Sequence, residues 1–115
     1  MENNCLFCRI ANRQLKADIV EEADGLLAFK DIHPQAPTHV LIIPIEHIPS
    51  VAQLTERHTL LIGNAIHMAN RIAKEHQLNQ AGYRLVVNCG LQAGQSVDHF
   101  HVHLLGGRKM LWPPG

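Results

Sequence analysis

The chain has 115 residues, 46% of them hydrophobic, and its ten basic residues balance its ten acidic ones. This length and composition predict one domain over residues 1–115 with a substantial hydrophobic core. The balanced charge argues against nucleic-acid or membrane partners, because both require a cationic face. Three cysteines, no apolar leader after Met1 and no run long enough to cross a bilayer predict a cytoplasmic protein with reduced thiols.

Hydrophobic periodicity and turn residues divide the chain into helices and strands. The predicted elements are, in chain order, a short helix at 4–13, strands at 18–22, 25–30 and 39–45, a long helix at 56–77, and strands at 83–88 and 98–105. The first two strands form a hairpin around Asp24-Gly25, a dipeptide typical of tight turns. One long helix among five strands predicts an α+β domain on a mostly antiparallel sheet.

The long helix carries clear start and packing signals. Thr55 is a good N-cap residue, and Glu56 places an acidic side chain in the first turn. Gly63 lowers helix stability by up to about 1 kcal/mol and therefore suggests that another element approaches closely there. Helical spacing predicts a buried face made of Leu61, Ala65, Met68, Ala69 and Ile72.

Histidines occupy alternate positions in the last predicted strand, at His99, His101 and His103. Alternate residues of a strand share one face, so the three imidazoles point one way and their apolar neighbours the other. Three interpretations compete: satisfied polar residues, a metal site, and catalysis by one imidazole assisted by the others. A three-histidine metal site is strained, because the outer pair are about 13 Å apart on a flat strand.

A polar loop directly before these histidines favours catalysis on a phosphate. Residues 88–96, "NCGLQAGQS", include Gly90, Gly94 and Ser96, which let backbone N–H groups and a hydroxyl approach an anion. Taken alone, the loop is more typical of an ordinary turn than of a phosphate site. Histidine acts as nucleophile, acid or base near neutral pH, which suits a phosphate held against an imidazole.

Three segments together resemble the histidine triad (HIT) family, in particular its nucleotide-binding Hint branch. They are "LAFKDIHPQAPTHVLIIP" at 27–44, "GYRLVVN" at 82–88 and "GQSVDHFHVHLLGGRKMLWPPG" at 94–115. The resemblance implies one HIT domain over 1–115, with a five-stranded antiparallel sheet, one long and one short helix, and a sheet continued across a homodimer. It also implies hydrolysis of the P–N bond of purine nucleoside phosphoramidates, with AMP- or GMP-type substrates.

The resemblance assigns catalytic roles residue by residue. His101 matches the nucleophile, which would carry the nucleotidyl group, with a backbone carbonyl fixing its tautomer. His103 would donate to the phosphate and, with Ser96, protonate the leaving amine. His39 and His99 would form the outer polar shell, and no metal is required for this chemistry.

Further positions match the nucleotide pocket and its surroundings. Asp31 would accept from the ribose hydroxyls beside Ile32, and Trp112 would shape the leaving-group side across the dimer interface. The phosphate loop would be Asn88, Gly94, Gln95 and Ser96. The base pocket would be Phe7, Ile10, Leu15, Phe29 and Leu41, although plain core packing explains these five apolar residues equally well.

A second site is suggested by the Cys5-x-x-Cys8 spacing, which is typical of zinc binding and sometimes of redox chemistry. In similar bacterial proteins a structural zinc is held by this pair together with histidines that match His47 and His99, and two thiolates with two imidazoles form a sensible tetrahedral set. Similar proteins without these cysteines fold without zinc. Two other functions stay open: a nucleotide-binding regulator with incidental hydrolysis, and a dinucleoside polyphosphate hydrolase.

Overall fold

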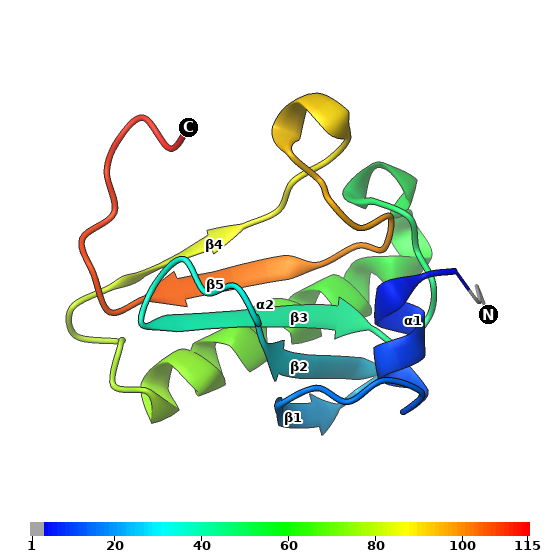
Figure 1. Ribbon diagram of the computed structural model, residues 1–115, viewed down its shortest axis with the longest axis horizontal. Coiled ribbons are helices and arrows are strands. Elements are labelled where there is room, and N and C mark those ends of the chain that lie inside the picture. Colours follow the sequence, from blue (N-terminus) through cyan, green and yellow to red (C-terminus); the bar gives the residue numbers. More distant parts are fainter. Residues whose placement is uncertain (1–3) are drawn as a thin grey trace.

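A computed structural model describes residues 4–115 and contains one five-stranded antiparallel sheet (Figure 1). The elements are α1 (Leu6–Ala11), β1 (Ile19–Ala23), β2 (Leu26–Lys30), β3 (Thr38–Pro44), α2 (Thr59–Glu75), β4 (Tyr83–Val86) and β5 (Val102–Gly106), with 3₁₀ turns at Val51–Gln53, Glu56–His58 and Leu91–Ala93. The strand order is β1-β2-β3-β5-β4, which makes β3 the central strand. The predicted α+β architecture, an antiparallel five-stranded sheet with one long and one short helix, is confirmed.

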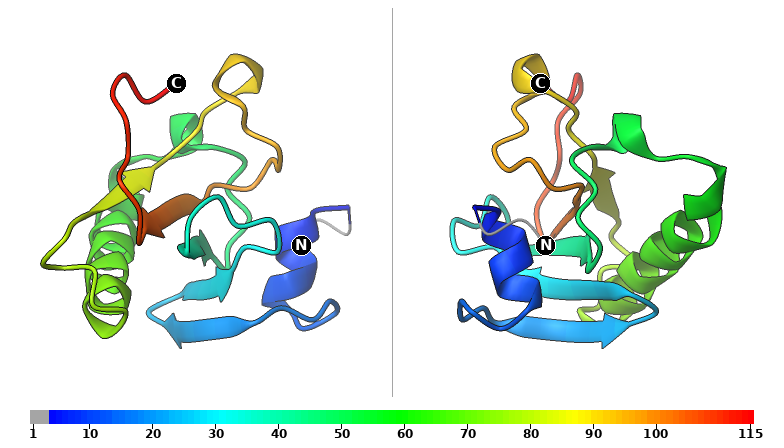
Figure 2. Two further views of the ribbon diagram at one scale, coloured as in Figure 1. Left: turned by 60° about the vertical axis from the view of Figure 1, so that its left-hand side comes forward. Right: turned by 90° about the vertical axis from the view of Figure 1, so that its right-hand side faces the viewer.

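The two helices cover opposite faces of the sheet (Figure 2). The α2 face holds the larger core, to which Phe100 and the β5 residues Val102 and Leu104 contribute. The α1 face holds a smaller apolar cluster built from α1, β2 and β3. Alternate residues of the inner strands therefore separate into two buried layers, as the pleat of a strand requires.

The predicted hairpin and helix face are both confirmed. Asp24 and Gly25 have φ angles of 57° and 76°, the left-handed pair that a two-residue hairpin turn needs. On α2, four of the predicted side chains are buried and Leu61 is half-buried at the margin, while Ala73 is buried in addition. The predicted close approach of another element to Gly63 is wrong, because a Cβ built there would meet nothing within 4 Å.

Several predicted boundaries were too wide. The long helix runs over 59–75 instead of 56–77, because Thr55 begins a separate 3₁₀ turn and the backbone N–H of Thr55 donates to the His58 ring 2.9 Å away. The short helix covers 6–11 instead of 4–13, and β4 ends at Val86 instead of residue 88. No helix in the described part of the chain is long and apolar enough to cross a membrane.

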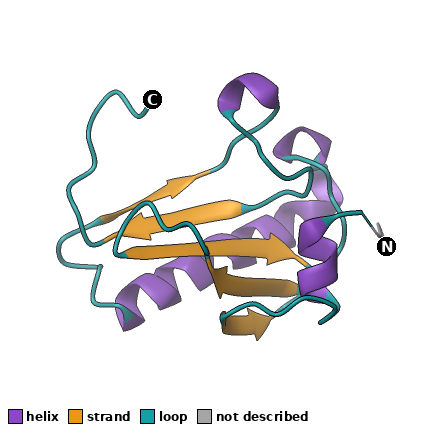
Figure 3. Cartoon of the chain, viewed as in Figure 1, coloured by secondary structure: helices purple, strands orange, loops and turns teal. Residues whose placement is uncertain are grey.

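The most consequential correction concerns the strand that carries the histidines. It was predicted over 98–105, but β5 begins only at Val102, so His99 and His101 lie in the irregular segment that leads into it (Figure 3). β5 pairs with β3 from Ile42↔Val102 onward, and β3 ends at Pro44. A proline has no N–H to extend the ladder, and the backbone N–H of Phe100 instead donates to the Ile48 carbonyl 2.6 Å away.

Candidate functional site

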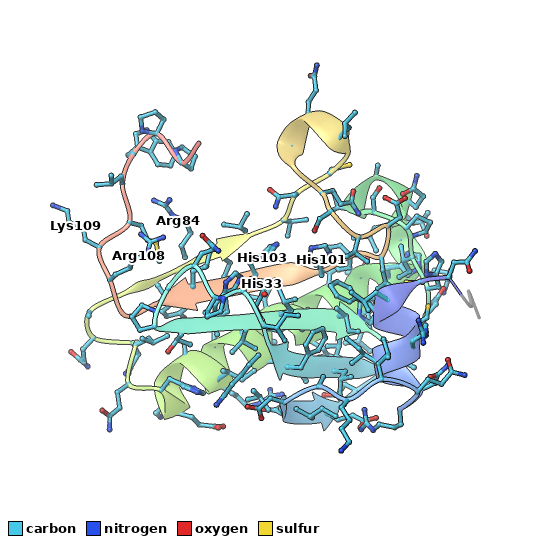
Figure 4. The ribbon with its side chains drawn as sticks, in the orientation of Figure 1. His33, Arg84, His101, His103, Arg108 and Lys109 are labelled. Atoms are coloured by element: carbon cyan, nitrogen blue, oxygen red, sulfur yellow. The ribbon has the colours of Figure 1, made fainter. Side chains whose placement is uncertain are left out.

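The histidines lie on the α1 face of the sheet, opposite the α2 core. Pairing of β3 with β5 places His39 opposite Leu105 and Leu41 opposite His103. The alternation of side chains continues through the irregular segment, so His99 and His101 share the face of His103 while Phe100 and Val102 enter the other core. Figure 4 shows His101 and His103 side by side above the sheet.

A backbone carbonyl determines which nitrogen of His101 carries a proton. Its Nδ1 lies 2.7 Å from the His99 carbonyl oxygen. Because a carbonyl only accepts, Nδ1 must donate an N–H, which leaves the lone pair of a neutral ring on Nε2. The ring is 4% exposed and meets the edge of Phe7 at a centroid distance of 5.1 Å. His101 therefore has the tautomer that a nucleophile using Nε2 requires.

A chain of hydrogen bonds determines the tautomers of His39 and His103 in the same way. The backbone N–H of Gln35 donates to His39 Nδ1 at 3.0 Å, so the proton of a neutral His39 is on Nε2. That Nε2 lies 2.9 Å from His103 Nδ1, which must accept. A neutral His103 consequently carries its proton on Nε2 and can donate it to a ligand.

Burial keeps both of these rings neutral. The pKa of His103 is lowered to about 4, chiefly by burial and also by the neighbouring His101 and His39, against the opposing effect of Asp31. Burial also lowers the pKa of His39, whereas the Asp31 carboxylate raises it. At neutral pH the pair His39–His103 is therefore an uncharged donor–acceptor chain.

Asp31 lies between the histidines and the loop that follows β2. Its Oδ2 is 3.4 Å from His39 Nε2, and its Oδ1 accepts the backbone N–H of His33 at 2.8 Å. Ile32 is 83% exposed beside it. A cavity of about 170 Å³ is lined by Asp31, His39, Val40 and neighbouring loop residues. The carboxylate is thus held in place next to the site, and its contact with a ribose stays a prediction.

The glycine-bearing loop is held by one of its own predicted ligands. The Gln95 amide nitrogen donates to the Pro49 and Val97 carbonyls at 2.8 and 3.0 Å, and its oxygen accepts the Gly90 N–H at 2.9 Å. The Gln95 side chain therefore shapes the loop through internal bonds. Ser96 is exposed, Asn88 is half-buried and Gly94 has a left-handed φ of 85°. Their contact with a phosphate stays a prediction.

The proposed base-pocket residues form the small core under α1. Phe7, Ile10, Phe29 and Leu41 are all buried in one cluster, with Leu15 packed at its edge. The Phe7 and Phe29 rings meet edge to face at a centroid distance of 5.5 Å. Core packing thus accounts for these side chains in the free protein, and contact with a purine stays a prediction.

The C-terminal tail lies apart from this core. Trp112 is 82% exposed, and Arg84 of β4 holds the tail through a 2.9 Å bond to the Leu111 carbonyl. Figure 4 shows Arg84 and Arg108 on the same side of the molecule as His103, with Lys109 farther out. Sequence reasoning missed Gln35, Pro44 and Arg84. Gln35 and Pro44 act through their backbone groups, which no side-chain pattern marks.

Cys5, Cys8, His47 and His99 converge as one cluster with donor atoms within 4.8 Å of one another. His99 Nδ1 lies 3.3 Å from Cys5 Sγ, 3.5 Å from Cys8 Sγ and 3.3 Å from His47 Nδ1, and Cys8 Sγ lies 3.2 Å from His47 Nδ1. Tetrahedral zinc with ordinary bond lengths separates two nitrogens by about 3.3 Å and a nitrogen from a sulfur by about 3.6 Å. The residues present therefore fit a zinc ion.

The surroundings of the cluster also suit a metal. The His99 Nε2 is 2.8 Å from the Pro44 carbonyl, so it donates there and leaves the Nδ1 lone pair directed at the cluster. Burial is the main cause that lowers the pKa of His99. Cys5 caps α1, where its Sγ accepts the Cys8 N–H at 3.4 Å. A cavity of about 440 Å³ opens beside Cys5, His47 and Ser96.

Comparison with known proteins agrees with this geometry. Residues 4–112 match the family model of the scavenger mRNA decapping enzyme C-terminal binding domain. A HIT-like protein of Synechococcus elongatus is 44% identical over the whole of both chains. A 14 kDa zinc-binding protein of Zea mays is 46% identical, over 96% of this chain and 87% of its own length.

Solved structures extend the agreement to three dimensions. A HIT family hydrolase from Legionella pneumophila superposes with a TM-score of 0.95 and 48% identity, covering 97% of this chain and 100% of that one. A HIT family hydrolase from Clostridium thermocellum superposes with a TM-score of 0.93 and 44% identity, covering 96% of each chain. The sequence matches, the shared fold and the alternating histidines together establish that this chain belongs to the histidine triad (HIT) family.

Proposed function

We propose that the protein is a hydrolase that cleaves the P–N bond of purine nucleoside phosphoramidates through a nucleotidyl group carried on His101. The observation that carries the proposal is the bond from His101 Nδ1 to the His99 carbonyl, which leaves Nε2 available for attack. His103 lies beside it, with ring centroids 4.9 Å apart and an N–H on its own Nε2. A nucleophile with a neighbouring proton donor suits displacement at phosphorus.

In the first half of the reaction, His101 Nε2 forms a bond to the α-phosphorus and the P–N bond of the substrate breaks. The electron pair of that bond leaves with the amine, which receives a proton from His103, assisted by Ser96. An anionic phosphate next to His103 favours protonation of that ring, which offsets the effect of burial in the free protein. Transfer of the nucleotidyl group to His101 divides one difficult displacement into two easier ones.

In the second half, water attacks the same phosphorus and the bond to His101 Nε2 breaks. His103 takes a proton from the attacking water, which restores both histidines. One water is consumed, and a nucleoside monophosphate and a free amine are produced. The backbone bond from His99 holds His101 in one tautomer through both halves, so the ring needs no reorganisation between them.

The remaining assignments concern the nucleotide. Asp31 is placed to accept from ribose hydroxyls, since the carboxylate is already oriented by the His33 N–H and lies beside His39. Asn88, Gly94 and Ser96 would bind the phosphate oxygens. The purine would lie against the Phe7 and Leu41 end of the α1 cluster.

We also propose that the cluster of Cys5, Cys8, His47 and His99 binds a structural zinc ion. The Zea mays relative, a 14 kDa zinc-binding protein, supports this proposal. The ligands come from α1, from the segment after β3 and from the segment before β5. A bound zinc would cross-link these three parts of the chain and supply no step of the hydrolysis. Metal analysis of protein purified without chelator tests the assignment, and a zinc content near zero contradicts it.

A second copy of this chain is the protein partner that we propose, joined through the β4 edge. β4 is an outer strand of the sheet, with an apolar run ending at Val87, which is 41% exposed. The opposite edge, β1, carries Glu21 and Glu22 and an irregular register, features that discourage strand addition. Sedimentation of the purified protein is expected to give the mass of two 12.8 kDa chains; a single-chain mass would contradict the dimer.

Mass spectrometry of enzyme quenched during turnover of an AMP-amide tests the proposed reaction. A nucleotidyl adduct on His101 is expected, and His101→Ala should abolish turnover while the circular dichroism spectrum stays that of the folded protein. Turnover by that variant at the wild-type rate would refute the proposal. Faster cleavage of dinucleoside polyphosphates, or tight AMP binding without turnover of any amide, would instead support one of the two other functions.

A further inference from the structure

His99 belongs to two groups at once. Its ring contributes Nδ1 to the cysteine–histidine cluster, at 3.3 Å from both Cys5 Sγ and His47 Nδ1. Its backbone carbonyl accepts the Nδ1–H of His101 at 2.7 Å. One residue therefore carries both a metal-ligating atom and the atom that determines the tautomer of the nucleophile.

The connection between these two groups is short and closely packed. His99 is fully buried, and its Nε2 donates to the Pro44 carbonyl 2.8 Å away. Phe7 meets both rings edge to face, with its centroid 6.0 Å from His99 and 5.1 Å from His101. Movement of the His99 ring would therefore displace its own peptide and the Phe7 contact of His101.

The close approach of the His99 and His47 rings requires a proton or a metal ion between them. His99 donates through Nε2, so a neutral ring has only a lone pair on Nδ1, and this lone pair faces His47 Nδ1 across 3.3 Å. Two facing lone pairs repel unless a proton or a metal ion lies between the rings. A zinc ion satisfies Cys5, Cys8 and both imidazoles together, whereas protons must be distributed among four competing atoms.

We propose that the cluster positions the nucleophile: metal bound by Cys5, Cys8, His47 and His99 fixes the His99 peptide, and this peptide keeps His101 in its reactive tautomer. His99 is accordingly a positioning residue, since it acts through His101. The inference rests on the proposed role of His101 for its effect on rate. Its effect on the tautomer and on metal affinity is independent of any substrate.

Thermodynamic linkage makes the coupling reciprocal. If the metal favours the arrangement in which His101 is held, then a nucleotide that orders His101 must tighten metal binding by the same factor. Couplings of this kind are typically about fivefold or larger. The zinc dissociation constant of the wild-type protein, measured by competition with a chelator, is therefore expected to fall by about fivefold when the protein is saturated with AMP.

Nuclear magnetic resonance of the ¹⁵N-histidine-labelled protein tests the proposal directly. Zinc-loaded protein is expected to show His101 as a single tautomer protonated at Nδ1, whereas chelator-treated protein shows a mixture of both tautomers. Circular dichroism identifies samples that remain folded. An identical His101 signature in folded zinc-loaded and zinc-free protein would overturn the proposal, as would failure of the wild-type protein to bind zinc.

Two cysteine substitutions supply a matched comparison. Cys8→Ser removes one of the four candidate ligands, and Cys89→Ser makes the same change at an exposed cysteine outside the cluster. Cys8→Ser should slow nucleotidylation and weaken AMP binding, each by about fivefold or more, and Cys89→Ser should alter neither. Equal rates for the two variants would count against positioning.

The design separates the inference from the proposed reaction. If Cys8→Ser does not fold, His47→Gln and chelator-treated wild-type protein give the same comparison. If no nucleotidyl adduct forms in any sample, the proposed function fails, and the tautomer spectra and the zinc affinities still decide whether the cluster positions His101.

Discussion

Replacing His103 with glutamine should make the free energy of unfolding less dependent on pH between 6.5 and about 4. His103 has an ordinary pKa of 6.5 when the chain is unfolded and about 4 in the folded protein, chiefly because the ring is buried. Between those values the unfolded chain binds a proton that the folded protein does not. Stability contributed by the neutral ring is therefore complete above pH 6.5 and is lost as the pH falls toward 4.

The size of this effect follows from the displacement of the pKa. At about 1.36 kcal/mol per pH unit, the full shift corresponds to about 3.4 kcal/mol of unfolding free energy. Because the ring is partly accessible to solvent, screening reduces that value, and we expect about 2 kcal/mol. Glutamine retains an acceptor for His39 Nε2, so the hydrogen bond survives while the titrating group is removed.

Urea unfolding at intervals between pH 4 and pH 7.5 measures the difference. Wild-type stability should fall more steeply with decreasing pH than that of His103→Gln, so that the two curves converge toward low pH. His67→Gln, a change at an exposed ring on α2, gives the reference for losing a histidine outside the site. Parallel curves for wild type and His103→Gln would refute the reasoning that burial of this ring opposes its protonation.

Three further outcomes are expected. Gly63→Ala should raise the free energy of unfolding by up to about 1 kcal/mol, because the added methyl group meets nothing within 4 Å and alanine favours a helix. Gly106→Ala should lower the free energy of unfolding by about 1–3 kcal/mol, because its Cβ would lie 2.6 Å from a methyl group of the buried Leu78. Thermal melting that gave the same sign for both variants would contradict this. Asp31→Asn should weaken AMP binding about tenfold in calorimetry while leaving 2′,3′-dideoxy-AMP unaffected, since only the ribose hydroxyls donate to the carboxylate. Removal of residues 111–115, which include the exposed Trp112, should change the ranking of amine leaving groups without changing the melting temperature; an unchanged ranking would argue against a role for the tail.

Backbone hydrogen bonds hold the buried histidines of this protein. Four histidines, His39, His58, His99 and His101, are buried, and each ring has at least one nitrogen bonded to a backbone group. Backbone groups satisfy an imidazole without introducing a compensating charge, and at His39 the Asp31 carboxylate 3.4 Å away opposes the larger effect of burial on the pKa. The site is therefore suited to bind an anionic phosphate with polarised N–H groups rather than with fixed cations.

Local patterns were sufficient for the parts of this protein that depend on neighbours in sequence. Asp24-Gly25 formed the predicted turn because left-handed φ angles are a property of those two residues. Phe100, Val102 and Leu104 entered the core because side chains alternate along extended backbone, even where no strand is formed. The histidine alternation and the cysteine spacing likewise identified part of each cluster, whereas His39 and His47 were found only through the family resemblance.

Tertiary structure alone decided where strands end and which nitrogens carry protons. β5 begins at Val102 because its partner β3 ends at a proline, a limit that residues 98–101 do not encode themselves. His39 meets His103 across 64 positions and Cys5 meets His99 across 94, so their contacts arise only from strand pairing and helix docking. The tautomers depend on acceptors supplied by distant backbone, such as the Pro44 carbonyl, because a ring nitrogen donates only where the folded chain provides an oxygen.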